Sequence, residues 1–244
     1  MDIETVAEVI DRHRWTDDIT ISGPGGSPSY SSEQFGSTAH KTGNFLSHFG
    51  VHPDATVGIH PGPGMAPILS VFGAGLLGAT VEFVRHPEDH MAVFIAPGDV
   101  WTATNPSIPP GVTGIAYRGS GTESRIRAFG RGVWSENPYC PTDPAVQSET
   151  SLFHSPDGSI THGSLIAAAR DLGVNQPLAT TDHVRVHGHV GTPESFLLGV
   201  LFPLLQPASI AFDAQLPDGD VTIRIVRSDG ETRLDAADIS LDIR

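Results

Sequence analysis

The sequence is poor in lysine and in cysteine. Its 244 residues hold 14 lysine and arginine residues against 28 aspartate and glutamate residues, a formal net charge of −14, and the single lysine is Lys41. Sequence-independent binding to nucleic acid or to an anionic membrane needs a positive surface, so we expect neither partner. Cys140 is the one cysteine, which excludes an intrachain disulfide and a cysteine-based zinc site.

The sequence also shows neither a secretion signal nor a membrane-spanning pattern. Residues 1–15 are acidic and amphipathic, unlike the basic and apolar leader of a secreted protein. The longest apolar stretch, residues 65–84, is interrupted by glycines and fits a buried helix followed by a strand. We therefore expect a soluble, cytoplasmic protein, and 39% hydrophobic residues suffice for a substantial core.

Helix and strand patterns alternate along the first part of the chain. The expected elements are a helix over 3–13, a hairpin of strands 19–22 and 29–31, a helix over 31–50, a strand over 55–60, a helix over 64–79 and a strand over 80–84. The last three form a βαβ unit, which implies parallel strands joined by a right-handed crossover.

The rest of the chain reads as a less regular middle followed by a second αβ run. The expected elements are a short helix near 87–96, strands near 99–103 and 112–117, long loops over 105–149, a helix over 162–172, a strand over 183–188, a helix over 193–205, a strand over 208–213 and a terminal hairpin. The fold class is α/β, a mostly parallel sheet flanked by helices, with one domain over 1–213 and a β-hairpin tail over 214–244.

Three patterns suggest chemistry, and each has a simpler structural explanation. Gly62 and Gly64 form a G-x-G turn between a strand and a helix, but Pro67 takes the third glycine position of a dinucleotide motif. Neighbouring serines and histidines near 154–164 suggest a hydrolase, yet no G-x-S-x-G elbow is present.

The histidines are the third pattern. Period-2 alternation would place His183, His187 and His189 on one face of a strand, where imidazoles could bind zinc. Strand residues four apart lie about 13 Å apart, which makes shared coordination difficult. We expect no metal site.

Residues 152–170 combine a strand, a small polar turn and a helix start, the arrangement in which backbone N–H groups bind phosphate. The turn 155–158 holds one glycine and no lysine, and the charge of Asp157 would repel a phosphate. These features indicate a phosphate loop that has lost its function.

Several phrases, taken in order, resemble the adenylate-forming superfamily of AMP-binding acyl-CoA synthetases and ligases. They are SYSSEQF, GVHPDATVGI and LLGATVEF within 28–83, SITHGSLIAAA after the turn, and residues 184–213. The resemblance implies a truncated and degenerate N-terminal domain of that type, in which the phosphate loop lacks its lysine and all but one glycine. Residues 219–243 resemble the family's late, hinge-proximal segment, which would put Asp220 at the ribose-binding acid and Asp238 at the hinge acid.

The resemblance also implies a degenerate nucleotide or acyl site without catalytic residues. Its members would be Ser155, Asp157, Gly158, Thr161, His162 and His189. We expect no cofactor, and ATP, AMP or CoA only if the site is retained. The function expected is that of a pseudoenzyme acting through ligand or partner binding. The alternatives are a trimmed AMP-forming acid–thiol ligase, active alone or with another subunit, and a small hydrolase or histidine–metal protein.

The helix expected over 193–205 is apolar on nearly every side, and such a helix is either buried or part of an interface. A trimmed domain would leave part of it exposed, so we expect a homodimer or a partner protein to cover it. Alternatively, the tail hairpin folds over the helix and the chain is a monomer.

The charge balance generates a first prediction. Low lysine with dispersed carboxylates resembles haloarchaeal proteins, although an ordinary acidic protein remains an alternative. Salt screens carboxylate repulsion and strengthens apolar burial, so the melting temperature should rise steadily from about 0.1 M to about 3 M KCl. A melting temperature independent of salt in differential scanning fluorimetry would show that the acidic surface has no such role.

Overall fold

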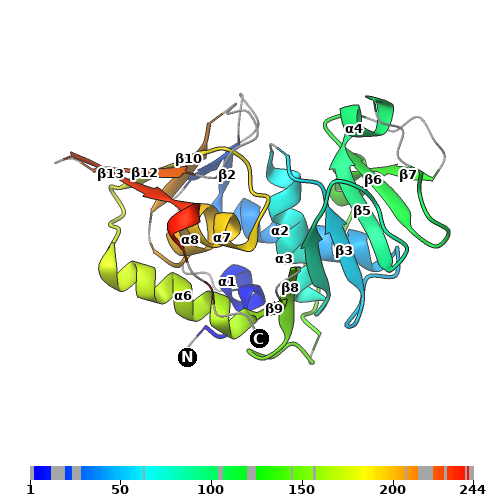
Figure 1. Cartoon of the computed structure of the whole chain (residues 1–244), viewed down its shortest axis with the longest axis horizontal. Coiled ribbons are helices and arrows are strands. Elements are labelled where there is room, and N and C mark those ends of the chain that lie inside the picture. Colours follow the sequence, from blue (N-terminus) through cyan, green and yellow to red (C-terminus); the bar gives the residue numbers. More distant parts are fainter. Residues whose placement is uncertain are drawn as a thin grey trace.

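The computed structural model describes residues 3–11, 20–23, 29–62, 64–103, 107–119, 125–143, 145–155, 158–206, 208–213, 222–227, 230–239 and 241. Within these ranges the strands form two sheets, one of six and one of seven strands, with helices between and around them (Figure 1). The α/β class, with parallel strands flanked by helices, is confirmed, while the expectation of one sheet is wrong.

The seven-stranded sheet comes from one continuous stretch of the chain. Its strands are β3 (Thr56–Ile59), β4 (Thr80–Phe83), β5 (Met91–Pro97), β6 (Thr113–Tyr117), β7 (Ile126–Ala128), β8 (Ser151–Ser155) and β9 (Gly158–Thr161). Their order is β7-β6-β5-β3-β4-β8-β9, and the neighbours are parallel except for the antiparallel pair β8–β9.

The six-stranded sheet combines segments from the two ends of the chain. Its strands are β1 (Thr20–Ser22), β2 (Ser29–Ser31), β10 (His183–His187), β11 (Ser209–Phe212), β12 (Thr222–Arg227) and β13 (Gly230–Asp235). The order is β13-β12-β10-β11-β1-β2, with a parallel centre and antiparallel hairpins at both edges. The tail hairpin is therefore part of this sheet, because β12 pairs with β10.

The helices connect and cover the two sheets. They are α1 (Val6–Asp11), α2 (Ser32–Ser47), α3 (Met65–Leu76), α4 (Gly98–Ala103), α5 (Phe129–Trp134), α6 (His162–Asn175), α7 (Pro193–Phe196), the π-helical segment η2 (Leu197–Leu201), α8 (Phe202–Leu205) and the 3-10 turn η3 (Ala236–Asp238). Figure 1 shows α2 and α3 between the two sheets. Buried apolar side chains from both sheets belong to one continuous core.

The middle of the chain differs from the sequence-based expectation. The helix expected near 87–96 is wrong, since Met91–Pro97 is the strand β5, and the strand expected near 99–103 is the helix α4. β5 lies between two parallel neighbours and is buried on both faces, so its sequence is a continuous apolar run without strand alternation. Such a run is as compatible with a helix as with a strand. The expected loop region 105–149 also contains β7 and α5.

The apolar helical segment 193–205 is buried within the single chain. Phe196, Leu197, Leu198, Leu201 and Phe202 are all completely inaccessible to solvent. The segment contacts β12 and η3, which both belong to the tail. The tail thus packs on the helix together with α6, as the monomer alternative expects, and residues 195–204 of the segment are buried without a second copy. Homodimerisation stays a prediction without that support.

Helices α2 and α3 approach each other closely through two glycines. Every residue of α3 from Met65 to Leu76 is buried. A Cβ atom added to Gly73 would lie 2.9 Å from the backbone nitrogen of Gly43 and 3.0 Å from Cγ2 of Thr42. These distances leave no room for a methyl group, so glycine is required there for the two helices to pack.

This contact generates the second prediction. Gly73→Ala should lower the free energy of unfolding by about 1–3 kcal/mol, because the methyl group overpacks a buried helix contact. The matched control is Gly130→Ala in α5, where an added Cβ meets nothing within 4 Å. That substitution should leave the stability unchanged or raise it by up to about 1 kcal/mol. Urea denaturation measures both, and equal stabilities would contradict the packing argument.

Candidate functional site

The turn 155–158, which the sequence assigns to a degenerate phosphate loop, joins the antiparallel strands β8 and β9. Ser155 and Gly158 face each other in the β8–β9 register, and the Ser155 hydroxyl donates a hydrogen bond to the Gly158 carbonyl oxygen over 3.3 Å. Asp157 lies outside the described residues. The two described residues thus use polar groups to close a tight hairpin.

Thr161 and His162 follow the hairpin at the start of α6. Thr161 is the N-cap residue: its hydroxyl accepts a hydrogen bond from the Ser164 backbone N–H at 3.2 Å, and the Thr161 N–H donates to the Ser164 hydroxyl at 3.1 Å. The backbone N–H groups of Thr161 and Ser164, which could otherwise hold an anion at the start of α6, are therefore already hydrogen-bonded within the chain.

His162 lies in the core. Its side chain is inaccessible to solvent, and its Nδ1 atom accepts a hydrogen bond from the Val6 backbone N–H at 3.2 Å. The proton therefore resides on Nε2, which is buried and has no hydrogen-bond partner among the described residues. Burial lowers the pKa of His162 to about 4, while the carboxylate of Glu8 has a smaller, opposite effect. The residue joins α6 to α1 as a neutral core side chain.

His189 lies near His60, the residue that follows β3, because its charge is among those that act on the pKa of His60. Burial lowers the pKa of His60, and the hydrogen bond to the Pro61 carbonyl oxygen opposes this effect. Gly191 packs on Pro61, since an added Cβ would lie 2.8 Å from the Pro61 Cβ. The five described residues among the six assigned to one site from the sequence are thus distributed over a hairpin, the start of α6, the core and the neighbourhood of His60.

Two further sequence patterns can be placed. β10 ends at His187, so strand alternation does not extend to His189, and His187 Nδ1 lies 3.2 Å from an Asp213 carboxylate oxygen. Within the described ranges, no three histidine, cysteine, aspartate or glutamate side chains gather so that they could hold a metal ion. In the same part of the chain, no helix combines the length and apolarity needed to cross a bilayer.

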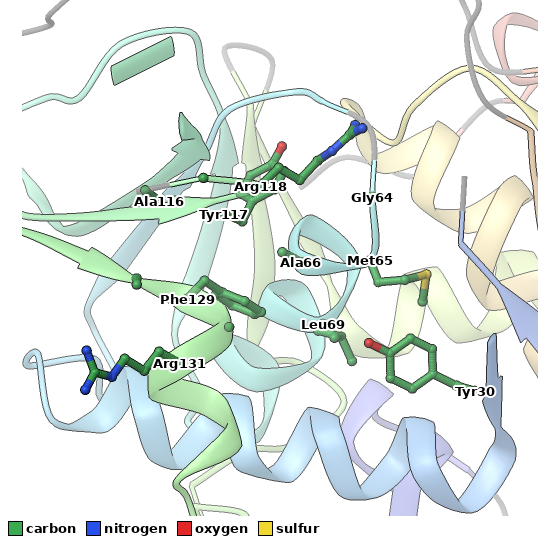
Figure 2. Close-up of a pocket in the computed structure, with 13 residues that line it drawn as sticks. Tyr30, Gly64, Met65, Ala66, Leu69, Ala116, Tyr117, Arg118, Phe129 and Arg131 are labelled. Carbon is green, nitrogen blue, oxygen red and sulfur yellow. The ribbon is translucent and has the colours of Figure 1, made fainter. Parts of the chain in front are cut away.

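A pocket of about 400 Å³ opens beside the N-terminal end of α3 (Figure 2). It lies where β3 and β6 end, and open α/β sheets bind ligands at the carboxyl ends of their strands. Its walls include Met65 and Leu69 of α3, Tyr117 of β6, Phe129 of α5 and Tyr30 of β2. We call it the α3 pocket. The G-x-G turn of Gly62 and Gly64 was the sequence signal for it, because this turn leads from β3 into α3.

The mouth of the α3 pocket combines a helix N-terminus with an arginine, and the Asp99 carboxylate is also close enough to act on Tyr117 of the lining. Gly64 is the N-cap of α3 with φ of 121°, no side chain caps the helix, and its first turn has no acidic residue. The backbone N–H groups of Met65 and Ala66 lie at the positive end of the helix dipole, while Pro67, the third residue of the helix, has no N–H to offer. Arg118 and Arg131 are the charged residues of the lining, which includes no described carboxylate.

The two arginines differ in orientation. Figure 2 shows the Arg118 side chain extending from the end of β6 toward Gly64, whereas Arg131 points away from the pocket. Cδ of Arg118 lies 3.8 Å from the position of a Cβ on Gly64. Arg118 has a φ of 54°, in the left-handed region that side chains other than glycine rarely adopt. Of the two arginines in the pocket lining, it is the one that approaches the uncapped helix end.

Tyr117 supplies a buried hydroxyl next to this mouth. The side chain is 4% exposed, and its oxygen has no hydrogen-bond partner in the part of the chain that the structure describes. Burial raises the pKa of Tyr117 and, to a smaller extent, that of Tyr30. Both hydroxyls therefore remain protonated donors at neutral pH.

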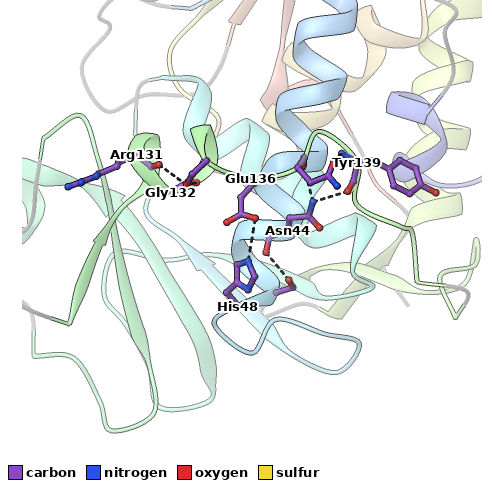
Figure 3. Close-up of polar contacts among 9 residues, drawn as sticks. Asn44, His48, Arg131, Gly132, Glu136 and Tyr139 are labelled. Carbon is purple, nitrogen blue, oxygen red and sulfur yellow. Dashed lines mark hydrogen bonds and ion pairs between the residues drawn. The ribbon is translucent and has the colours of Figure 1, made fainter.

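The wall formed by α5 is fixed to α2 (Figure 3). The Asn44 side-chain amide donates to the carbonyl oxygens of Asn137 and Tyr139 at 2.9 and 2.8 Å, and His48 Nε2 lies 3.3 Å from a Glu136 carboxylate oxygen. A Cβ on Gly132 would overlap the Phe45 ring, so α5 lies directly against α2. The pocket is consequently preformed by packed elements.

Comparison with known proteins gives a fold but no sequence relative. No protein-family model matches the chain, and no curated protein matches it in sequence. Solved structures do match: a benzoate CoA ligase from Burkholderia xenovorans LB400 has a TM-score of 0.69 at 17% identity, over 87% of this chain and 46% of that one.

Two further structures give the same result. The anthranilate CoA ligase AuaEII in complex with anthranoyl-AMP has a TM-score of 0.70 at 15% identity, over 85% of this chain and 44% of that one. The N-terminal domain of FACL13 from Mycobacterium tuberculosis has a TM-score of 0.68 at 14% identity, over 88% of this chain and 58% of that one. The resemblance to acyl- and aryl-CoA ligases is thus confirmed for the fold, and the chain spans about half the length of the structures it matches.

The buried histidine generates the third prediction. The pKa of His162 is about 4 in the folded protein and ordinarily 6.5, so between these values the unfolded chain binds a proton that the folded protein excludes. The contribution of His162 to the free energy of unfolding should be fully present above pH 6.5 and should fall by up to about 3 kcal/mol toward pH 4. His162→Gln keeps an acceptor for the Val6 N–H and removes the titration, so it should reduce this pH dependence.

Urea denaturation at constant salt from pH 7.5 to 4.5 measures the difference between the variant and the unmodified protein. His183→Gln, on the exposed side of β10, is the control, and its free energy of unfolding should depend on pH as in the unmodified protein. If the free energy of unfolding of His162→Gln shows the same pH dependence as the unmodified protein, His162 is not the buried neutral group that we describe.

Proposed function

We infer that the chain is a non-catalytic, ligand-binding protein built on the fold of the first half of AMP-forming acyl- and aryl-CoA ligases. The observation that carries this proposal is the hairpin at 155–158, at the place where the resemblance puts the phosphate loop. There Ser155 and Gly158 pair with each other across antiparallel strands.

Adenylation needs donors and cations that stabilise charge as it develops on the phosphates. The described residues around the hairpin do not fit a nucleoside triphosphate: Thr161 and Ser164 cap α6 between themselves, and His162 is buried. The one lysine is also elsewhere, since the Lys41 ammonium lies 5.5 Å from the centroid of the Trp134 ring. We therefore assign no step of the ligase reaction to this chain.

Ligand binding is favoured by the α3 pocket. Small-molecule sites are concave, mostly apolar and equipped with a few polar groups that orient the ligand. The α3 pocket has this composition, with apolar walls from Met65, Leu69 and Phe129 and polar groups at its mouth.

A second candidate is a trimmed ligase that is completed by another polypeptide segment or subunit. It is favoured by one observation, that the chain matches 44–58% of the length of the three ligase structures. In that case the other segment or subunit would supply the nucleotide contacts.

The fourth prediction separates these functions. We expect no acid-dependent exchange of pyrophosphate into ATP with benzoate, anthranilate or short and long fatty acids, measured with Mg²⁺ in high salt. A complete CoA ligase assayed in parallel is the positive control. Exchange well above a sample without protein would overturn the non-catalytic proposal and favour the trimmed ligase.

A further inference from the structure

Three arginines lie side by side on the six-stranded sheet. Arg185 of β10 is in register with Arg224 of β12, and Arg224 is in register with Arg233 of β13. Residues in register on neighbouring strands share one face of a sheet, and neighbouring strands are about 4.8 Å apart. We call these three residues the arginine row. They are three of the 14 lysine and arginine residues in a chain with a formal net charge of −14.

The arginine row lies on the face of the sheet that is turned away from the core. Along β10 and β12 the arginines alternate with side chains that are completely inaccessible to solvent, namely Val184, Val186, Ile223 and Ile225. The buried side of β12 contacts the segment η2. All three arginines are exposed, so the described part of the chain leaves the outer face open at the row.

An open outer face is unusual for the topology of this sheet. Its central strands β10, β11 and β1 are parallel, and parallel strands are in general covered by helices on both faces. A further helix over the outer face would complete this arrangement. The exposed side chains at the row are cationic, so a helix that fits there presents negative charge rather than an apolar stripe.

The arginine row is unfavourable for the stability of the free chain. Both strand pairs in the row are antiparallel, and like charges directly opposite each other destabilise such a pair. Sequences break local rules of this kind mainly at functional sites. Binding of an anion would relieve the repulsion among the three guanidinium groups.

Carboxylates of the chain itself compensate only part of the charge. Glu231 Oε1 lies 3.4 Å from Nη1 of Arg224, and Asp235 Oδ1 lies 3.1 Å from Nη2 of Arg233. The side chains of these two arginines are 47% and 62% exposed, and an exposed ion pair contributes little to stability. Arg185 has no hydrogen bond or ion pair with another described residue. The row can therefore accept carboxylates from outside the chain.

The neighbourhood of Arg185 leaves room for a second backbone. On β11 and β1 the residues in register with it are Ala211 and Ser22, whose side chains are small. Asp213, which follows β11, lies 3.2 Å from Nδ1 of His187 and so has a partner of its own. The outer face is thus flat beside the row, and the carboxylate on this side is engaged elsewhere.

We propose that the arginine row docks an acidic α-helix of a partner protein, which lies across β10, β12 and β13 and places one carboxylate on each arginine. Glutamates at positions i, i+4 and i+7 of a helix are about 5–6 Å apart, close to the spacing of neighbouring strands. The planar guanidinium group binds a carboxylate with two parallel hydrogen bonds. The inference goes beyond the proposed ligand binding, since the row shares no residue with the α3 pocket.

Other occupants fit the arginine row less well. A nucleic acid or a long polyphosphate extends beyond the row and meets the acidic remainder of the surface, which repels it. In a two-fold dimer formed through this face, the two rows would face each other and repel. A short acidic helix avoids both problems.

The fifth prediction uses fluorescence anisotropy with a labelled, alanine-based helical peptide of about 20 residues that carries glutamates at repeated i, i+4 and i+7 positions. The unmodified protein should bind this peptide at least about ten times more tightly than the same peptide with lysine in place of glutamate. A peptide of the same composition whose glutamates are distributed over all sides of the helix should also bind more weakly. Added KCl should weaken binding, because salt screens the charges.

Arg224→Thr tests the centre of the row. Threonine suits an exposed strand, so the melting temperature should be retained, while binding of the glutamate peptide should weaken about fivefold or more. Arg185→Thr removes the arginine without a partner among the described residues and should have a similar effect. Arg127→Thr is the matched control, because Arg127 is an exposed arginine of β7 in the other sheet, and it should bind like the unmodified protein.

Two results with the peptide would overturn the proposal: absence of binding, or equal binding by Arg224→Thr, Arg185→Thr and the unmodified protein. Tripolyphosphate, single-stranded DNA and sedimentation of the protein alone test the other occupants. Tighter binding of either polyanion than of the peptide, or a dimer that dissociates in Arg224→Thr, would assign the row to that occupant instead. Each of these results leaves pyrophosphate exchange untouched, so the two proposals are tested separately.

Discussion

The close contact between α2 and α3 at Gly43 and Gly73 is the constraint on which the rest of the structure depends. With no side chain between them, the two helices pack at backbone distance, and α3 is buried along its whole length. The Phe72 ring on α3 then lies 5.4 Å from that of Phe35 on α2 and 5.5 Å from that of Phe196 on α7. One buried helix thereby joins the cores of the two sheets.

The same helix connects the pocket with the core. Its first residues form the mouth of the α3 pocket, and near its other end Gly75 lies against Val6 and His162. A displacement of α3 would therefore change the pocket and the contact between α1 and α6 together. Two of the four buried polar side-chain atoms without a partner among the described residues, those of Tyr117 and His162, lie at these two ends, and so does Arg118 with its positive φ.

Local patterns in the sequence predict much of the fold. The βαβ unit and the helices α2 and α6 follow from short-range periodicity. The strand β5 could not be recognised in this way, because burial on both faces removes the alternation that distinguishes a strand. The division into two sheets depends on pairings between residues far apart in sequence, which periodicity does not encode.

The candidate site was less predictable for a related reason. Arg118, Tyr30 and Met65 are unremarkable in sequence, and only the packing of three separate elements brings them together around one cavity. Conversely, the position of His162 just after a polar turn suggests a site residue, yet its complete burial gives it a structural role. Whether a polar residue is used in binding or in packing depends on tertiary neighbours.

The composition of the two sheets has a consequence for the order of folding. The seven-stranded sheet is made from residues 56–161 and can assemble from one uninterrupted stretch during synthesis. The six-stranded sheet pairs β1 with β11, so its first strands must wait until residues near 210 have left the ribosome. Closing such a long loop is slow, and the unpaired edge of β1 is meanwhile open to other chains. Aggregation during synthesis is thus a hazard that this topology creates, independent of the stability of the finished protein.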